Sequence, residues 1–472
     1  MRCTYNGTGN TIGGPHKQPV LDKIINGATY TLSAWIRASK AMNIRFYNEY
    51  MKTSDKFVIN GGRKLNGSLS VPKAKNSYLA ILAACALCDG QVLLHECPHF
   101  DDIDRMIDIL TVLGIKVERI DNDLLLDCRF LHSFAIPSPL AKQIRSSIFM
   151  LGPLLARLGK AVVTYPGGCD IGARPIDLHL SGLSKLGVKV QESHGNISCL
   201  SQGDICGEVH LDYPSVGATE NLIMSAVLSN GTTKLYNCAK EPEIVDLQNF
   251  INSMGAKIYG AGTDTIVVEG VVSLHSTEYT PIADRIICGT YMLAAATCGG
   301  DITLKNVEYE HIYSLITKLS DAGLQVDLAR DSIRLVGDTR PYSFGRIETM
   351  PYPGFPTDLQ PQALVLQTIS RGNCVIVENL FNSRLKHVPE LVKMGADIKA
   401  IDRTAFVSGV ERLYGAEVQS SDLRAGAALT IAGLVAEGQT IVDNVSHIDR
   451  GYDHMEKDLS CLGADIKRVS AD

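Results

Sequence analysis

Long apolar runs are absent from this sequence of 472 residues. No stretch reaches the roughly 18 apolar residues that a membrane-spanning helix needs, so we expect no membrane span. An excess of positive charge is missing as well, because the formal net charge is −6. This balance argues against a nucleic-acid partner and leaves room for a local cationic pocket. The composition, with 45% hydrophobic and 20% charged residues, is typical of a soluble globular protein.

The 13 cysteines lack the spacing of a disulfide framework. Many lie in apolar segments, a usage that is typical of a reducing cytoplasm, where we expect this protein. Residues 1–50 lack regular periodicity and the basic-then-apolar order of a secretion signal. We therefore interpret residues 1–56 as a loosely ordered N-terminal extension, and we hypothesise that 1–50 arise from an upstream start codon.

A helix end, a glycine and a short alternating strand recur six times beyond Phe57. The six glycines are Gly114, Gly187, Gly255, Gly323, Gly395 and Gly463, at intervals of 68 to 73 residues. Each glycine suits the position after a helix, where a left-handed backbone conformation ends it. Six copies at nearly constant spacing predict six repeated structural units.

Each copy also carries a second helix that is apolar on nearly all sides, as in 76–87, 290–296 and 424–436. Such helices are buried all round. The predicted unit is a buried helix, a strand, an amphipathic helix and another strand. The sequence thus predicts an α/β protein of two lobes with three units each, helices inside and sheets outside. We expect 75–282 to form the first lobe, and 57–74 plus 283–472 the second.

The stretch Tyr165-Pro-Gly-Gly-Cys-Asp-Ile-Gly-Ala-Arg-Pro175 predicts an exposed loop, because its glycines and prolines exclude a regular helix or central strand. It holds one thiol, Cys169, and one guanidinium, Arg174. A loop thiol beside cationic groups can ionise, attack or donate a proton. The loop alone fits a tight turn with an incidental cysteine equally well.

The starts of the predicted buried helices carry charged and polar residues. These are Lys75 with Asn76, Arg145, Ser215 with Gly217, Asp284, Asp358, and Asp422 with Arg424. Helix N-termini favour anions, and basic residues there do not stabilise the helix itself. Lys75 and Arg145 therefore indicate anion binding in a cleft between the lobes, where closure excludes water.

Eight segments together carry a resemblance to a known family. They are Ala74-Lys-Asn76, Ile144-Arg-Ser-Ser147, the 166–175 loop, Ser215-Val-Gly-Ala-Thr219, Phe355-Pro-Thr-Asp358, Arg384 before His387-Val-Pro-Glu390, Asp422-Leu-Arg424 and His447-Ile-Asp-Arg-Gly451. Over Phe57 to Val469 the chain resembles the UDP-N-acetylglucosamine 1-carboxyvinyltransferases, a family of enolpyruvyl transferases. The resemblance implies their two-lobe fold, an inside-out α/β barrel of six units.

The resemblance also implies an activity. The enolpyruvyl group of phosphoenolpyruvate would move to the 3′-hydroxyl of UDP-N-acetylglucosamine with release of phosphate, the first committed step of peptidoglycan precursor synthesis. By resemblance Cys169 is the proton donor, which can form an adduct with phosphoenolpyruvate and react with fosfomycin. Asp358 is the base for the sugar hydroxyl. Lys75, Arg450 and Asp422 complete the implied catalytic group.

Family members also suggest which residues bind the substrates. Lys75, Arg174 and Arg450 would hold phosphoenolpyruvate, with Arg424 nearby. The nucleotide sugar would contact Asn76, Arg145, Arg174, Pro175, Ile176, Asp177, Leu178, Tyr213, Pro214, Ser215, Val216, Leu380 and Arg384. No cofactor or metal is implied, the partners are small molecules, and the oligomeric state stays open.

Plainer interpretations exist for several of these residues. Lys75 and Arg145 could be solvated charges, Asp358 and Asp422 simple N-caps, and Arg450 a surface partner of Asp449.

Five further residues, Cys85, Cys88, His95, Cys97 and His99, have a spacing compatible with zinc. The apolar helix that holds Cys85 and Cys88, with no second Cys pair after it, favours buried, inert thiols. Two other functions remain open, namely 3-phosphoshikimate 1-carboxyvinyltransferase, whose family lacks the Pro-Gly-Gly-Cys loop, and a catalytically idle regulatory relative.

Overall fold

A computed structural model describes residues 55–167, 176–337 and 340–470. The described residues belong to one compact unit, Thr53–Asp472. The predicted N-terminal extension therefore lies almost wholly outside the described residues, as does the 168–175 part of the predicted loop. Within the described ranges, no helix combines the length and apolar character needed to cross a membrane.

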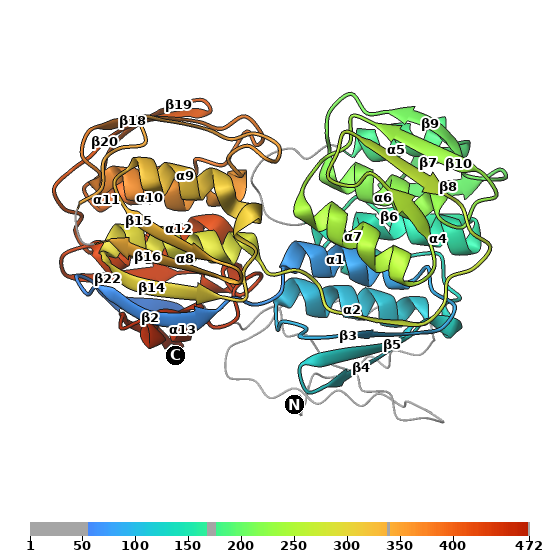
Figure 1. The fold of residues 1–472 in the computed structure, drawn as a ribbon, viewed down its shortest axis with the longest axis horizontal. Coiled ribbons are helices and arrows are strands. Elements are labelled where there is room, and N and C mark those ends of the chain that lie inside the picture. The colour runs from blue at the N-terminus through green and yellow to red at the C-terminus, as the bar shows by residue number, and fades with distance from the viewer. Residues whose placement is uncertain (1–54, 168–175, 338–339, 471–472) are drawn as a thin grey trace, which may run out of the picture. The chain divides into compact units, whose positions relative to one another are not determined.

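The first three repeated units form three sheets (Figure 1). Unit 1 contains α1 (Lys75–Cys85), β3 (Gln91–Leu94), α2 (Asp101–Leu113), β4 (Lys116–Ile120) and β5 (Asp123–Asp127). The link to unit 2 contains η1 (Cys128–Phe130) and α3 (Ser138–Ala141). Unit 2 contains η2 (Arg145–Met150), α4 (Leu151–Leu158), β6 (Lys160–Thr164), α5 (Asp177–Lys185), β7 (Val188–Ser193) and β8 (Asn196–Ser201). Unit 3 contains β9 (Gly207–His210), α6 (Val216–Ala226), β10 (Thr232–Tyr236), α7 (Pro242–Ser253), β11 (Lys257–Tyr259), β12 (Thr265–Glu269) and β13 (Thr277–Tyr279).

The last three units repeat this order. Unit 4 contains α8 (Arg285–Cys298), β14 (Gly300–Lys305), η3 (Tyr309–Ile312), α9 (Tyr313–Asp321), β15 (Gln325–Ala329) and β16 (Ser332–Gly337). Unit 5 contains β17 (Arg346–Glu348), η4 (Thr357–Leu359), α10 (Gln360–Ile369), β18 (Asn373–Val377), α11 (Val388–Lys393), β19 (Asp397–Ile401) and β20 (Thr404–Ser408). Unit 6 contains β21 (Glu417–Gln419), α12 (Leu423–Val435), β22 (Gln439–Asp443), η5 (Val445–His447), α13 (Met455–Cys461) and β23 (Asp465–Val469).

The N-terminal strands β1 (Lys56–Asn60) and β2 (Leu65–Ser70) complete sheets of the last three units. β1 lies between β22 and β23, and β2 runs parallel to β14. In the other direction, β13 runs parallel to β3 of unit 1. The two connecting segments then meet, because Lys73 and Ala283 form an antiparallel bridge. The proposed lobe boundaries at 74–75 and 282–283 fall in these two segments and stay a prediction.

Each unit contains at least one strand more than the sequence indicates. After the strand that follows the repeat glycine, the chain turns back in an antiparallel hairpin, as β4 and β5 or β15 and β16 do. In unit 6 the chain ends at β23, and β1 supplies the missing strand. The six glycines all have positive φ, between 84° and 109°, which confirms their role in ending the amphipathic helices.

The cores of the units are helical. Helices α8, α10 and α12 contact one another and carry sheets on their outer sides (Figure 1). Every residue of α10 is buried, including the polar Gln360, Gln362 and Gln367. In the first three units, α1 contacts α7 and α4 contacts α6. This arrangement brings the starts of the buried helices to the cavity described next.

Candidate active site

A cavity of about 820 Å³ collects most of the residues that the sequence singles out. Its lining includes Lys75, Asn76, Arg145, Asp177, Leu178, Tyr213, Pro214, Ser215, Val216, Asp358, Leu380, Arg384, Asp422, Arg424 and Arg450. Ile176 is 5% exposed and is not among the lining residues. Cys169, Arg174 and Pro175 lie outside the described residues. The starts of α1, η2, α6, η4 and α12 therefore share one cavity.

Asp358 lies between two arginine side chains in this cavity. Arg384 Nη2 contacts Asp358 Oδ1 at 2.5 Å, and Arg424 Nη2 contacts Asp358 Oδ2 at 3.3 Å. Both guanidinium groups are nearly inaccessible, whereas 28% of the Asp358 side chain is exposed. Neither η4 nor α10 has a side-chain cap bond at its start. The N-cap interpretation of Asp358 is therefore wrong.

The neighbouring cations control the charge of Asp358. Burial acts to raise the pKa of this carboxyl, but Arg424, Arg384 and Lys75 outweigh it and hold the pKa well below its usual range. Asp358 is consequently ionised at neutral pH. A carboxylate held in this way is a weak base for as long as both guanidinium groups stay bound to it.

Arg424 is held from behind by a chain of buried polar groups. Arg424 Nη1 donates to the Tyr452 hydroxyl at 3.3 Å, and that hydroxyl lies 2.8 Å from Thr290 Oγ1. Gln362 Nε2 donates to Thr290 Oγ1 at 3.1 Å. Thr290 on α8 and Gln362 on α10 thus support the Tyr452 hydroxyl, which in turn holds one nitrogen of the guanidinium.

A second carboxylate, Asp102 on α2, also lies between two cations. Lys75 Nζ is 3.2 Å from Asp102 Oδ2, and Arg450 Nε is 2.9 Å from Asp102 Oδ1. All three side chains are at most 15% exposed. The Asp449 carboxylate instead binds Arg468, at 2.5 and 3.1 Å. The interpretation of Lys75 as a solvated charge, and of Arg450 as only a surface partner of Asp449, is therefore wrong.

Asp422 does cap a helix. Its Oδ1 accepts the backbone N–H groups of Arg424, at 3.0 Å, and of Ala425, at 3.2 Å. The side chain is 2% exposed and lies near His387, whose pKa burial lowers to about 4 even though the Asp422 charge acts to raise it. His387 is thus neutral at neutral pH. Capping accounts for the position of Asp422, and its catalytic role stays a prediction.

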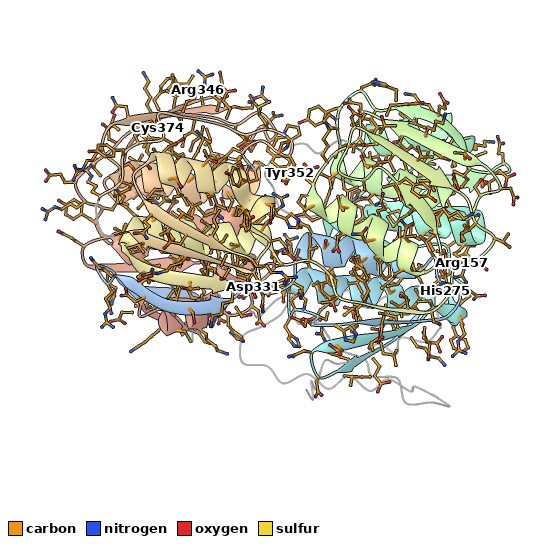
Figure 2. The ribbon with its side chains drawn as sticks, viewed as in Figure 1. Arg157, His275, Asp331, Arg346, Tyr352 and Cys374 are labelled. Atoms are coloured by element: carbon orange, nitrogen blue, oxygen red, sulfur yellow. The ribbon has the colours of Figure 1, made fainter. Side chains whose placement is uncertain are left out.

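Another wall of the cavity is acidic. Arg285 Nε and Nη2 donate to the two Glu243 oxygens at 3.0 and 3.2 Å. The backbone N–H of Tyr352, which Figure 2 labels, donates to Glu241 Oε1 at 3.3 Å. Burial, together with Glu243 and Glu241, raises the pKa of Glu220 well above its usual value. The raised pKa favours the neutral form of Glu220, which limits the negative charge of this wall.

The residues of the zinc interpretation have other surroundings. Cys85, Cys88 and Cys97 are buried, and burial raises the pKa of the Cys97 thiol to about 11. His95 Nδ1 lies 2.9 Å from Asp123 Oδ2. In the part of the chain that the structure describes, no three His, Cys, Asp or Glu residues are grouped to hold a metal ion. Burial thus favours the protonated form of these thiols, as the interpretation of buried thiols expects.

Sequence reasoning missed several residues of the lining. They include Asp102, Phe149, His179, Glu220, Glu241, Glu243, Arg285 and Tyr352. Glu241, Glu243 and Arg285 were findable, because acids and a base at helix starts are the same signal that identified Lys75. Asp102 offered a weaker signal, since acidic residues in the first turn of a helix are common for stability alone.

Comparisons with known proteins agree with the resemblance. The family model of EPSP synthase (3-phosphoshikimate 1-carboxyvinyltransferase) matches residues 59–459. UDP-N-acetylglucosamine 1-carboxyvinyltransferase 2 of Caldanaerobacter subterraneus subsp. tengcongensis is 51% identical over 414 residues, which are 88% of this chain and 99% of that protein. The protein of the same name from Carboxydothermus hydrogenoformans is 47% identical over 88% of this chain and 100% of its own.

Solved structures share the fold. The enolpyruvyl transferase NikO from Streptomyces tendae superposes with a TM-score of 0.80 at 24% identity, over 89% of this chain and 100% of that one. EPSP synthase from Acinetobacter baumannii has a TM-score of 0.68 at 16% identity, over 88% of this chain and 100% of that one. The prediction of the enolpyruvyl-transferase fold is confirmed.

The sequence and the fold together place the chain in the class of enolpyruvyl transferases. Within that class, the chain belongs to the family of the UDP-N-acetylglucosamine 1-carboxyvinyltransferases. Relatives with this name are 44 to 51% identical to it.

Proposed function

We propose that this protein transfers the enolpyruvyl group of phosphoenolpyruvate to the 3′-hydroxyl of UDP-N-acetylglucosamine and releases phosphate. The observation that supports this most is the concentration of cations in one cavity. Lys75, Arg384, Arg424 and Arg450 line it together with Arg145, and it is large enough for a nucleotide sugar. The activity is that named for the relatives at 44 to 51% identity.

Phosphoenolpyruvate is a compact anion with one phosphate and one carboxylate. Lys75 and Arg450 lie on the same carboxylate, Asp102, and so present two positive charges close together. Arg424 adds a third near Asp358. Arg174 is proposed to join them from the 165–175 loop. In a cavity that restricts water, such charges stabilise both the bound anion and the departing phosphate.

Asp358 is proposed to take the proton from the sugar hydroxyl. Its lowered pKa makes it a weak base in the unliganded site. When the substrate anion binds Arg424 or Arg384, the guanidinium shares its charge with a second anion, and the pKa of Asp358 rises. Phosphoenolpyruvate binding would thus strengthen the base in the same step that delivers the second reactant.

Cys169 is proposed to donate the proton that C3 of phosphoenolpyruvate receives. The hydroxyl oxygen forms a bond to C2 of phosphoenolpyruvate while C3 receives a proton. Loss of that proton from C3 then restores the double bond, and the C2–O bond to phosphate breaks with its electron pair going to phosphate. Cys169 lies outside the described residues, so this role rests on the family resemblance of the 166–175 segment.

The nucleotide side of the cavity is proposed to be formed by the starts of three helices. Arg145 begins η2, Asp177 and Leu178 begin α5, and the segment 213–216 leads into α6. Ser215 Oγ accepts the Ala218 N–H at 3.4 Å, which fixes the first turn of α6. Helix starts supply N–H groups and a positive dipole end for a diphosphate.

Phosphate release tests this function directly. Phosphoenolpyruvate would be incubated with the protein and either UDP-N-acetylglucosamine or shikimate 3-phosphate. We expect release only with the nucleotide sugar. Release with shikimate 3-phosphate alone would favour the 3-phosphoshikimate enzyme, whose family model covers 59–459. No release with either acceptor would favour the idle regulatory relative.

A further inference from the structure

Asp102 joins two parts of the chain that are far apart in sequence. Its carboxylate binds Lys75 of α1 and Arg450, which lies 348 residues further along the chain. The backbone supports the same junction, because Asp101 N donates to Asp449 O at 3.4 Å. The start of α2 therefore adjoins the 449–450 segment through both a side-chain and a main-chain contact.

Each oxygen of Asp102 has its own cation. Oδ2 contacts the Lys75 ammonium at 3.2 Å, and Oδ1 contacts Arg450 Nε at 2.9 Å. Binding through Nε fixes one edge of the planar guanidinium and so sets the direction of its other nitrogens. One carboxylate therefore determines both how far apart the two cations are and how the arginine is turned.

The surroundings keep Asp102 charged and hidden. Burial acts to raise its pKa, but Lys75 and Arg450 outweigh it and lower the pKa. Its side chain is only 9% exposed, whereas that of Asp358 is 28% exposed. Both carboxylates have their two oxygens occupied by protein groups, so it is the lower exposure of Asp102 that leaves it poorly placed to exchange protons with a substrate.

Lys75 has little freedom to move elsewhere. A Cβ atom built on Gly451 would lie 3.4 Å from Lys75 Nζ and 2.8 Å from Leu423 Cδ2. The ammonium thus packs against the backbone next to Arg450. The Lys75 backbone N–H is also held, by Asp284 Oδ2 at 3.0 Å. Within this confined space, the Asp102 carboxylate fixes the position of the Lys75 ammonium relative to Arg450.

We propose that Asp102 is a positioning residue that holds Lys75 and Arg450 in the geometry that binds the phosphoenolpyruvate anion. The proposal rests on the proposed function of this cavity. Without the Asp102 charge, two neighbouring cations repel each other and the Arg450 guanidinium loses the bond that orients it. Binding of the compact anion weakens, while the nucleotide sugar keeps its own contacts at η2, α5 and α6.

The test compares Asp102→Asn, Asp102→Glu and the control Asp104→Asn. Asp104 lies on the same helix but pairs with Arg119 at 3.1 Å, and 46% of its side chain is exposed. Steady-state kinetics would give KM for each substrate and kcat. We expect Asp102→Asn to raise the KM for phosphoenolpyruvate at least tenfold and the KM for the nucleotide sugar less than twofold. Asp102→Glu should recover part of the loss, and Asp104→Asn should match the wild type.

Three results would overturn the proposal. One is an equal rise in both KM values, which is the mark of a general structural role. Another is an unchanged or lower KM for phosphoenolpyruvate in Asp102→Asn, which is the mark of a carboxylate that merely competes with the substrate. The third is an Asp102→Glu variant as impaired as Asp102→Asn, since charge would then not be what matters.

Calorimetry separates this proposal from the function on which it rests. Phosphoenolpyruvate would be titrated into folded wild type, Asp102→Asn and Asp102→Glu, with thermal unfolding as the check that each variant is folded. We expect at least tenfold weaker binding to Asp102→Asn, even if phosphate release fails with UDP-N-acetylglucosamine. Should Asp102→Asn not fold, the Asp102→Glu variant decides: binding between two- and tenfold weaker than wild type supports the proposal, and unchanged binding overturns it.

Discussion

Asp358 and Asp102 are two carboxylates in one cavity, each between two cations, and they differ in what surrounds them. Asp358 binds Arg384 and Arg424 and has 28% of its side chain exposed. Asp102 binds Lys75 and Arg450 and is 9% exposed. Both stay ionised because their cations outweigh burial. Exposure, and not charge, therefore distinguishes Asp358, the proposed base, from Asp102, the proposed positioning residue.

The sharpest way to break this comparison is Asp358→Asn. The amide keeps the shape of the side chain but cannot take a proton from the sugar hydroxyl, so we expect kcat to fall by about 10³-fold. The KM for phosphoenolpyruvate should change far less than in Asp102→Asn. Rapid kinetics with both substrates saturating would measure this. A variant that keeps more than a tenth of the wild-type kcat would show that Asp358 is not the base.

A third carboxyl, introduced as Cys169→Asp, extends the comparison to the proton donor. A carboxyl can still donate a proton, so some turnover should remain, whereas alkylation by fosfomycin should fall by at least about 100-fold because the thiolate nucleophile is gone. Intact-protein mass spectrometry would follow the adduct. Burial raises the pKa of several other thiols, among them Cys128 and Cys288, so they should not react. Continued alkylation of the variant would identify another nucleophile.

His179 shows how burial changes the pKa of a histidine that has no close counter-charge among the described residues. Burial, with a smaller contribution from Arg145, lowers the pKa of His179 to about 3. As the pH falls, the imidazole of the unfolded chain is protonated before the imidazole of the folded protein. The stability that the neutral imidazole contributes is therefore complete above about pH 6.5 and is lost as the pH falls towards 3. We expect the free energy of unfolding to drop by about 2 kcal/mol from this group between pH 6.5 and 5.

Chemical denaturation at several pH values would measure that loss. In His179→Gln the amide oxygen can still accept from Asn221 Nδ2, which lies 2.8 Å from His179 Nδ1, but no proton is gained. The slope of stability against pH should therefore be smaller in this variant. An unchanged slope would mean that His179 is not the group that titrates.

The smallest expected effect concerns Tyr452, which holds Arg424, one of the two arginines bound to Asp358. Tyr452→Phe removes the hydroxyl that Arg424 Nη1 and Thr290 Oγ1 contact. We expect about 1 kcal/mol less stability and a few-fold lower kcat/KM, since a buried donor loses its partner. Thermal unfolding and steady-state kinetics would measure both. A full loss of activity in a folded variant would place Tyr452 in the reaction itself.

Much of the fold follows from local sequence signals. The six glycines that end amphipathic helices, and the all-round apolar segments now seen as α1, α8 and α12, are readable without any tertiary information. The second strand of each hairpin was missed because it has no marker comparable to Gly114 or Gly463. The insertion of β1 between β22 and β23 joins the two ends of the folded region, which no local pattern encodes.

The candidate site, like the fold, could be predicted from the sequence only in part. Lys75, Arg145 and Asp422 were predictable as charges at helix starts, and the cavity lining includes all three. The pairing of Asp358 with Arg384 and Arg424 was not predictable, and the plainer interpretation of Asp358 as a helix cap was wrong. Asp102 was missed altogether, because its meaning depends on Arg450, 348 residues away. Side chains that act through long-range partners need the structure.

The most direct test of the account is to identify the product. Phosphoenolpyruvate labelled with ¹³C at C3 would be incubated with UDP-N-acetylglucosamine and the protein, and the nucleotide sugar analysed by NMR and mass spectrometry. The account predicts a labelled enolpyruvyl ether on the 3′-oxygen, formed in equal amount to free phosphate. Phosphate formed without a labelled nucleotide sugar, or a label attached to another oxygen, would contradict it.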